Sequence, residues 1–197
     1  QGKEARLKAK EGLALINGTQ AMTSMAAFTV YEGLKLLELS NVSLALTLEA
    51  LHGITDAYDP RVHAVRGQMG QMEVAKNVLS YLKDSEYTSR QGELRVQDAY
   101  SLRCAPQVHG ASLDALLHVK DKVEIEMNAV TDNPILFADE DAAISAGNFH
   151  GQPMALVIDY MKIALSELAN IAERRIERLV NPNLSNGLPP FLALKPG

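Results

Sequence analysis

A long stretch without proline, from Gln20 to Thr55, constrains the fold more than any other feature. Its apolar side chains recur every three or four residues, which places them on one face of an α-helix. These positions are Val30, Leu34, Leu37, Leu44, Leu48 and Leu51, with Asn41 as the one polar residue among them. The pattern predicts a long helix over the whole stretch.

Three further segments have the same helical spacing. They run from Pro60 to Lys83, from Gln107 to Val130 and from Pro153 to Val180. We expect Asn133-Pro134 to end the helix that begins at Gln107, because the residue before a proline is pushed out of helical space. Asp84–Gly92 reads as an exposed loop, and residues 135–152 as short segments that include a small hairpin. Four long helices predict an all-α fold, a long-helix bundle with minor short strands.

The composition excludes several classes of protein. The net charge is −5, and the 24 acidic and 19 basic residues are interspersed, so no basic surface for nucleic acid is expected. No apolar run reaches the roughly 18 residues of a membrane span. Cys104 is the single cysteine, which rules out an internal disulfide framework and favours a reducing cytoplasm. No metal-ligand spacing or glycine-rich phosphate loop is present.

Polar and glycine-rich clusters fall at the ends of the expected helices. They are Asn17–Gln20, Gln97–Cys104, Thr131–Pro134 and Gly147–Gly151. Functional side chains concentrate on loops held by rigid scaffolds. Each cluster taken alone is nevertheless more typical of a turn or a helix stop. Cys104 and His109 form a conceivable nucleophile pair, but no third orienting group accompanies them, which favours an ordinary half-buried thiol.

Together the clusters carry a resemblance. Residues 96–110 read Val-Gln-Asp-Ala-Tyr-Ser-Leu-Arg-Cys-Ala-Pro-Gln-Val-His-Gly and closely resemble the central motif of the aromatic amino acid ammonia-lyases. Matches to the same family follow in family order over nearly the whole chain. They are Asn17-Gly-Thr, Thr131-Asp-Asn-Pro134, the segment Ser145–Pro153 and the segment Glu173–Val180.

Within that family, Tyr-Ser-Leu-Arg-Cys and Phe149-His150 are similar to the histidine ammonia-lyases. The resemblance implies non-oxidative elimination of ammonia from L-histidine to give urocanate. Phenylalanine enzymes usually have glutamine after that phenylalanine, whereas tyrosine-specific bacterial relatives can share the histidine. A phenylalanine or tyrosine ammonia-lyase, or an aminomutase of the family, remains an alternative. For the isolated chain, a catalytically silent helical oligomerisation module is a further one.

The reaction needs a strong electrophile, because the β-proton is barely acidic and an amine is a poor leaving group. The family forms a methylidene-imidazolone by cyclisation of an Ala-Ser-Gly tripeptide. That tripeptide does not occur here, and Ser145-Ala-Gly147 has similar residues in another order. We therefore expect residues 1–197 to be a central helical segment of a larger subunit. They would lack the N-terminal part that forms the electrophile and also the C-terminal part.

The resemblance implies roles for three substrate-binding residues. Arg103 would bind the substrate carboxylate, for which a planar two-pronged guanidinium is better suited than a lysine. Asn133 would add a hydrogen bond to that carboxylate. Phe149 would line the same site and pack against the prosthetic group.

Three further residues would serve catalysis. Tyr100 would lie beside the electrophile and the amino group and transfer a proton. Asn17 would hydrogen bond and polarise the ring of the electrophile, and Gln97 would support this network. The family also implies a homotetramer around a large central helix bundle, with an amino acid substrate and with no metal, nucleic acid or membrane partner.

Overall fold

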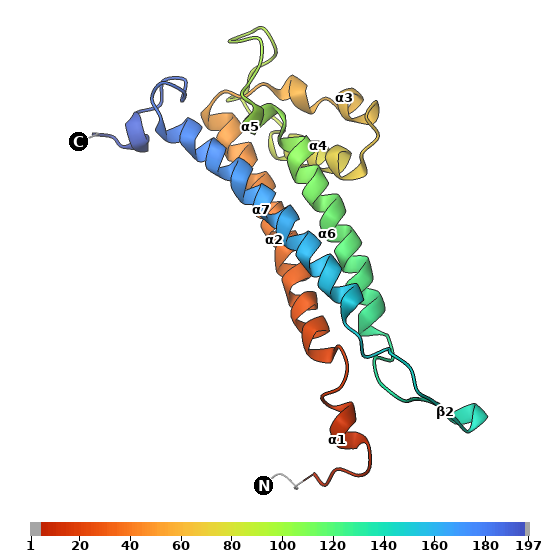
Figure 1. Cartoon of the computed structure of the whole chain (residues 1–197). Coiled ribbons are helices and arrows are strands. Elements are labelled where there is room, and N and C mark those ends of the chain that lie inside the picture. Colours follow the sequence, from red (N-terminus) through yellow and green to blue (C-terminus); the bar gives the residue numbers. More distant parts are fainter. Residues whose placement is uncertain (1–4, 196–197) are drawn as a thin grey trace. The chain divides into compact units, whose positions relative to one another are not determined.

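The computed structural model describes residues 5–195 (Figure 1). Helices dominate, and the only sheet among the described residues is one two-stranded hairpin, so the predicted all-α class is confirmed. The α-helices are α1 (Glu11–Ala14), α2 (Gln20–Ala50), α3 (Pro60–Ala64), α4 (Met69–Tyr81), α5 (Tyr100–Arg103), α6 (Ala105–Met127) and α7 (Gln152–Val180). Short 3-10 turns are η1 (Thr55–Tyr58), η2 (Ala138–Glu140) and η3 (Pro190–Leu192).

The chain divides into two compact units. Unit 1 contains residues 1–31 and 118–160, and unit 2 contains residues 32–117 and 161–197. Parts of α2, α6 and α7 belong to each unit and lie side by side within it (Figure 1). The predicted helix from Pro153 to Val180 is confirmed as α7.

Helix α2 ends at Ala50, five residues before the predicted Thr55. The chain leaves the helix at His52, whose φ of 49° lies in the left-handed region. The following N–H of Gly53 donates to the carbonyl of Leu48 at 2.6 Å. A left-handed residue followed by this bond is a common way to close a helix, because it satisfies a terminal carbonyl.

The single helix predicted from Pro60 to Lys83 is wrong. The structure has α3 and α4 instead, separated by a turn in which Gly67 has a φ of 79°. Glycine adopts this conformation without a Cβ penalty, so it is a natural place for a break. Asp59 caps α3 by accepting from the N–H of Arg61 at 2.8 Å.

The region between α6 and α7 departs from the prediction in one respect. Helix α6 ends at Met127, so Asn133-Pro134 lies beyond the helix and does not terminate it. The expected hairpin is present as β1 (Ile135–Phe137) paired antiparallel with β2 (Ala142–Ile144), with Ile135 opposite Ile144.

Each unit buries its own apolar side chains. In unit 2 the core is formed by Leu44, Ala45, Leu48, Leu51, Tyr58, Val74, Ala75, Val78, Leu82, Leu102, Ala105 and Ile171. In unit 1 the buried apolar residues include Ala26, Val30, Val119, Val123, Met154 and Val157. Of the apolar positions predicted in the first helix, all are buried except Leu34, which is half-buried. The hydroxyl of buried Tyr58 donates to the carbonyl of Leu102 at 2.6 Å, which attaches α5 to this core.

Helices α4 and α6 approach each other at Gly70 and Gly110. A Cβ on Gly110 would overlap main-chain atoms of Gln71 and lie 2.7 Å from the carbonyl carbon of Gly70. Gly110→Ala is therefore expected to lower the free energy of unfolding by about 3 kcal/mol, since main-chain atoms cannot move aside as a flexible side chain can. Denaturant unfolding measures this. Gly147→Ala is the control, because a Cβ there meets nothing within 4 Å; equal stability of the two variants would contradict the close contact.

Candidate functional site

Tyr100 and Arg103 share one face of α5, a single helical turn in unit 2. Residues three apart on a helix are neighbours. Arg103 Cζ lies 4.7 Å from the centre of the Tyr100 ring, so the guanidinium covers that ring. The Tyr100 side chain is 71 % exposed. The turn presents both side chains for contact with a ligand.

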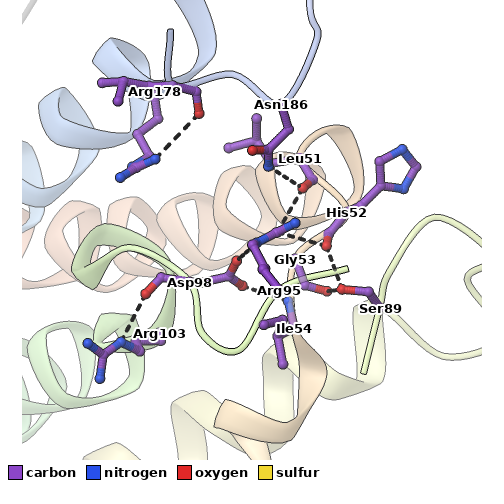
Figure 2. Close-up of polar contacts among 11 residues, drawn as sticks. Leu51, His52, Gly53, Ile54, Ser89, Arg95, Asp98, Arg103, Arg178 and Asn186 are labelled. Atoms are coloured by element: carbon purple, nitrogen blue, oxygen red, sulfur yellow. Dashed lines mark hydrogen bonds and ion pairs between the residues drawn. The ribbon is translucent and has the colours of Figure 1, made fainter. Parts of the chain in front are cut away.

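A cavity of about 350 Å³ adjoins this turn, and Arg103, Gln97, Asp98, Cys104 and Gln107 are among its lining residues. Arg103 Nε donates to the main-chain carbonyl of Asp98 at 2.9 Å (Figure 2). Within residues 5–195, no hydrogen bond or ion pair uses the two terminal nitrogens of Arg103. These nitrogens remain available as a two-pronged donor for a carboxylate.

The sequence prediction missed the contacts that surround Asp98. Its carboxylate accepts from the N–H of Ile54 and from Arg95 Nε, both at 2.6 Å. Arg95 also donates to the carbonyls of Leu51 and His52 at 2.9 Å each (Figure 2). Asp98 and Arg95 both adjoin the recognised motif, but nothing in their spacing indicates that they bind the end of α2.

Unit 1 brings together two of the polar clusters that are far apart in sequence. The Asn17 side chain lies beside the Asp132 carboxylate, which pairs with Lys10. The ion pair with Lys10 is the main cause that lowers the pKa of Asp132. Asp132 in turn accepts from the N–H of Asn133 at 2.7 Å. A Cβ on Gly18 would overlap the Thr131 carbonyl, so the close approach of the two loops requires glycine there.

Asn133 organises the loop that follows β2. Its side-chain oxygen accepts from the Ala146 N–H at 2.8 Å and from the Ser145 hydroxyl at 3.1 Å. Its amide N–H₂ group is therefore the part left to bind a ligand. Phe149 is 40 % exposed in the same loop. The six candidates thus form two groups, with Gln97, Tyr100 and Arg103 in unit 2 and Asn17, Asn133 and Phe149 in unit 1.

A buried polar cluster lies beneath α5 in unit 2. His109 Nδ1 lies 2.7 Å from the side-chain oxygen of Asn41, and Arg175 Nη1 lies 3.2 Å from His109 Nε2. Arg175 Nη1 also donates to the Ser101 carbonyl at 3.5 Å. His109 therefore accepts from Arg175 and donates to Asn41, which requires a neutral imidazole. Both ring nitrogens are engaged by these partners and not by Cys104, so the nucleophile pair with that thiol is not formed.

Burial, and secondarily the charge of Arg175, lower the pKa of His109 to about 3. An unfolded histidine titrates near 6.5, so the neutral ring favours folding fully above pH 6.5, and this contribution is lost as the pH falls toward 3. Between pH 7 and pH 5 we expect this group to remove about 2 kcal/mol of stability. Denaturant unfolding at both pH values measures the loss.

His109→Gln is the matched variant, because the glutamine amide can accept from Arg175 and donate to Asn41 but does not titrate. Burial also lowers the pKa of His63, so some acid sensitivity must persist in the variant. If the stability of both proteins fell equally between pH 7 and pH 5, His109 would not be the responsible group.

Within residues 5–195, we find no group of three His, Cys, Asp or Glu side chains positioned to hold a metal ion. The same residues include no helix with the length and hydropathy that crossing a membrane requires.

A family profile described as aromatic amino acid lyase matches residues 2–197. The chain belongs to this family. Histidine ammonia-lyase from Geobacillus kaustophilus is 62 % identical over 97 % of this chain, and histidine ammonia-lyase 1 from Fusobacterium nucleatum is 58 % identical over 97 %. The chain spans 38 % and 37 % of the length of these two aromatic amino acid lyases.

Solved structures of aromatic amino acid lyases and related enzymes have the same fold. Tyrosine aminomutase from Streptomyces globisporus superposes with a TM-score of 0.94 at 36 % identity, covering 99 % of this chain and 41 % of its own. Histidine ammonia-lyase from Trypanosoma cruzi superposes with a TM-score of 0.87 at 43 % identity, covering 98 % of this chain and 35 % of its own. The helical fold of the lyase family, predicted from the resemblance, is confirmed.

Proposed function

We propose that this chain is part of a carbon–nitrogen lyase that releases ammonia from L-histidine to give urocanate. The observation that carries the proposal is the identity of about 60 % with proteins named histidine ammonia-lyase over 97 % of the chain. The structurally similar aminomutases are less identical, at 36 %. That difference favours histidine elimination over aminomutase chemistry.

Arg103 is proposed to bind the substrate carboxylate through its two terminal nitrogens, since Asp98 already holds its Nε. Asn133 would add a hydrogen bond through the amide N–H₂ that its loop contacts leave available. Phe149 would contribute an apolar wall to the site. Each of these contacts would help to orient the substrate so that its amino group and β-carbon are presented to the catalytic residues.

Tyr100 is proposed to transfer the proton, with its ring held against the Arg103 guanidinium. The family uses a self-formed methylidene-imidazolone, which supplies the electrophile that ordinary side chains lack. The donors on this chain fit such a group, because Asn17 and Gln97 present uncharged amides and Tyr100 a phenol, all suited to hydrogen bond a ring carbonyl. No Ala-Ser-Gly occurs in residues 1–197, so another segment must supply the tripeptide.

We further propose a homotetramer in the cytoplasm, with residues 1–197 as a central helical segment of the subunit. Large apolar side chains on α2 support association, because they are exposed in the single chain. They include Met25, Phe28, Leu39 and Leu46, each at least 62 % exposed. A single cysteine agrees with a reducing compartment.

The test is incubation of the intact protein with histidine, tyrosine and phenylalanine in separate reactions. We expect ammonia and an ultraviolet-absorbing unsaturated acid with histidine, and much slower release with the other two. A β-amino acid product would instead identify an aminomutase. Release of ammonia from none of the three would overturn the proposal.

Arg103→Lys in the intact protein keeps the positive charge but removes the planar fork. We expect it to weaken transition-state binding by about 1–3 kcal/mol, measured as kcat/KM. Arg66→Lys serves as the control, because Arg66 is exposed and does not line the cavity. Equal kcat/KM for Arg103→Lys and the unaltered protein would exclude a two-pronged role for Arg103.

A further inference from the structure

Arg103 has one fixed nitrogen and two free ones. Its Nε donates to the Asp98 carbonyl at 2.9 Å, whereas its terminal nitrogens make no hydrogen bond or ion pair among residues 5–195. A guanidinium is planar and rigid, so a bond at Nε sets the direction in which the other two nitrogens point. The orientation of the Asp98 carbonyl therefore determines how Arg103 presents its fork to the cavity.

The side chain of Asp98 holds that carbonyl in place. It is 2 % exposed, and each carboxylate oxygen has a donor at 2.6 Å, the Ile54 N–H for one and Arg95 Nε for the other. A buried carboxylate is costly unless it is paired and hydrogen bonded. Both requirements are met here, so Asp98 has one well-defined position.

Arg95 connects this carboxylate to the end of α2. Its Nη2 donates to the carbonyls of Leu51 and His52 at 2.9 Å each, and Asn186 adds a bond to the Leu51 carbonyl at 3.0 Å. Figure 2 shows these contacts converging between the end of α2 and the segment that carries Arg95 and Asp98. The chain of contacts thus runs from the α2 terminus through Arg95 and Asp98 to Arg103.

We propose that Asp98 and Arg95 are positioning residues for the carboxylate-binding guanidinium of Arg103. This inference rests on the proposed function, because it assumes that Arg103 binds the carboxylate of an amino acid. Both carboxylate oxygens of Asp98 are taken by protein donors and Arg95 is bonded to Asp98 and the end of α2, so each residue would act through the direction of the Asp98 carbonyl. Substrate carboxylate binding should therefore be the property that fails when the pair is altered.

Asp98→Asn tests this directly in the intact protein. Asparagine has one acceptor oxygen and one donor group, but both neighbours of the carboxylate are donors, so one N–H must face another N–H. We expect the KM for the amino acid substrate to rise by about tenfold, because a small misplacement of a binding group has effects of this size. The kcat should change by less than about twofold, since the carboxylate contact is made equally in ground and transition states.

Arg95→Lys is the second variant, and its partly exposed side chain makes misfolding less of a risk. Lysine keeps the charge but cannot hold Asp98 and two carbonyls at once. Asp59→Asn is the matched control. Asp59 also accepts from a main-chain N–H and an arginine Nε, at 2.8 and 2.9 Å on the same oxygen, but has no contact with Arg103. Its KM should equal that of the unaltered protein.

Inhibition by the decarboxylated amine of the substrate separates positioning from a general structural role. This amine offers nothing to Arg103, so its inhibition constant should stay within about twofold in both variants while the KM rises. Equal weakening of amine and amino acid would indicate a damaged site and overturn the inference. So would an unchanged KM in a folded Asp98→Asn or Arg95→Lys protein.

The substrate is whichever of histidine, tyrosine and phenylalanine the unaltered protein converts, because all three carry the carboxylate. Activity of the unaltered protein with an unchanged KM in both variants overturns this inference alone. Inactivity of the unaltered protein with all three substrates overturns the proposed function, and this inference with it.

Discussion

A chain that contains only residues 1–197 is expected to form no urocanate from histidine. The physical reason is the missing electrophile: without Ala-Ser-Gly the methylidene-imidazolone cannot form from these residues. The remaining candidates can bind, orient or transfer protons, which lowers barriers on an existing reaction path. None of them makes an amine a good leaving group. Association of several copies does not help, because every copy lacks the same tripeptide.

The measurement follows urocanate by ultraviolet absorbance at high protein concentration, with the intact protein as the positive control. Mass spectrometry must confirm that the sample contains residues 1–197 alone, and circular dichroism that it is helical. Turnover above the buffer background in such a sample would show that the electrophile has another origin, and the proposed mechanism would be wrong.

Tyr100→Phe in the intact protein is expected to lower kcat by about 10²–10⁴-fold, the usual contribution of a group that transfers a proton. Phenylalanine keeps the ring that lies 4.7 Å from the Arg103 guanidinium carbon and removes only the hydroxyl. Because the ring is 71 % exposed and its hydroxyl makes no described hydrogen bond within residues 5–195, the melting temperature should hardly change. Steady-state kinetics with histidine and a thermal melt measure the two quantities.

Tyr87→Phe is a matched control, because Tyr87 is also exposed but lies outside α5 and does not stack on Arg103. Its kcat should equal that of the unaltered protein. Near-normal kcat in Tyr100→Phe, with the control also normal, would remove Tyr100 from the catalytic residues and leave it a role in packing against Arg103.

The sequence was sufficient to predict the long helices because their information is local. A spacing of three and four residues specifies one helical face, whatever packs against it. The residues Leu44, Leu48 and Leu51 follow that spacing and are buried. The motif from Val96 to Gly110 likewise indicated the family and the candidate site residues within it, since a contiguous motif can be recognised from sequence alone.

Two helix boundaries could be found only from the structure. The predicted helix from Pro60 to Lys83 has apolar spacing on both sides of Gly67, so periodicity alone does not reveal the break. The φ of 79° at that glycine does. Likewise the left-handed His52 closes α2 before Thr55, although histidine is not a strong helix-stop signal.

The polar contacts of the site were decided by tertiary structure alone. Asn41 looked like a defect in an apolar stripe, but it meets His109 from a segment 68 residues away. Asp98 meets Ile54 from 44 residues away. A buried polar group needs a hydrogen-bond partner, but the sequence does not indicate which residue that partner is. Only the packing of distant segments determines which donor reaches which acceptor, and therefore how Arg103 is held.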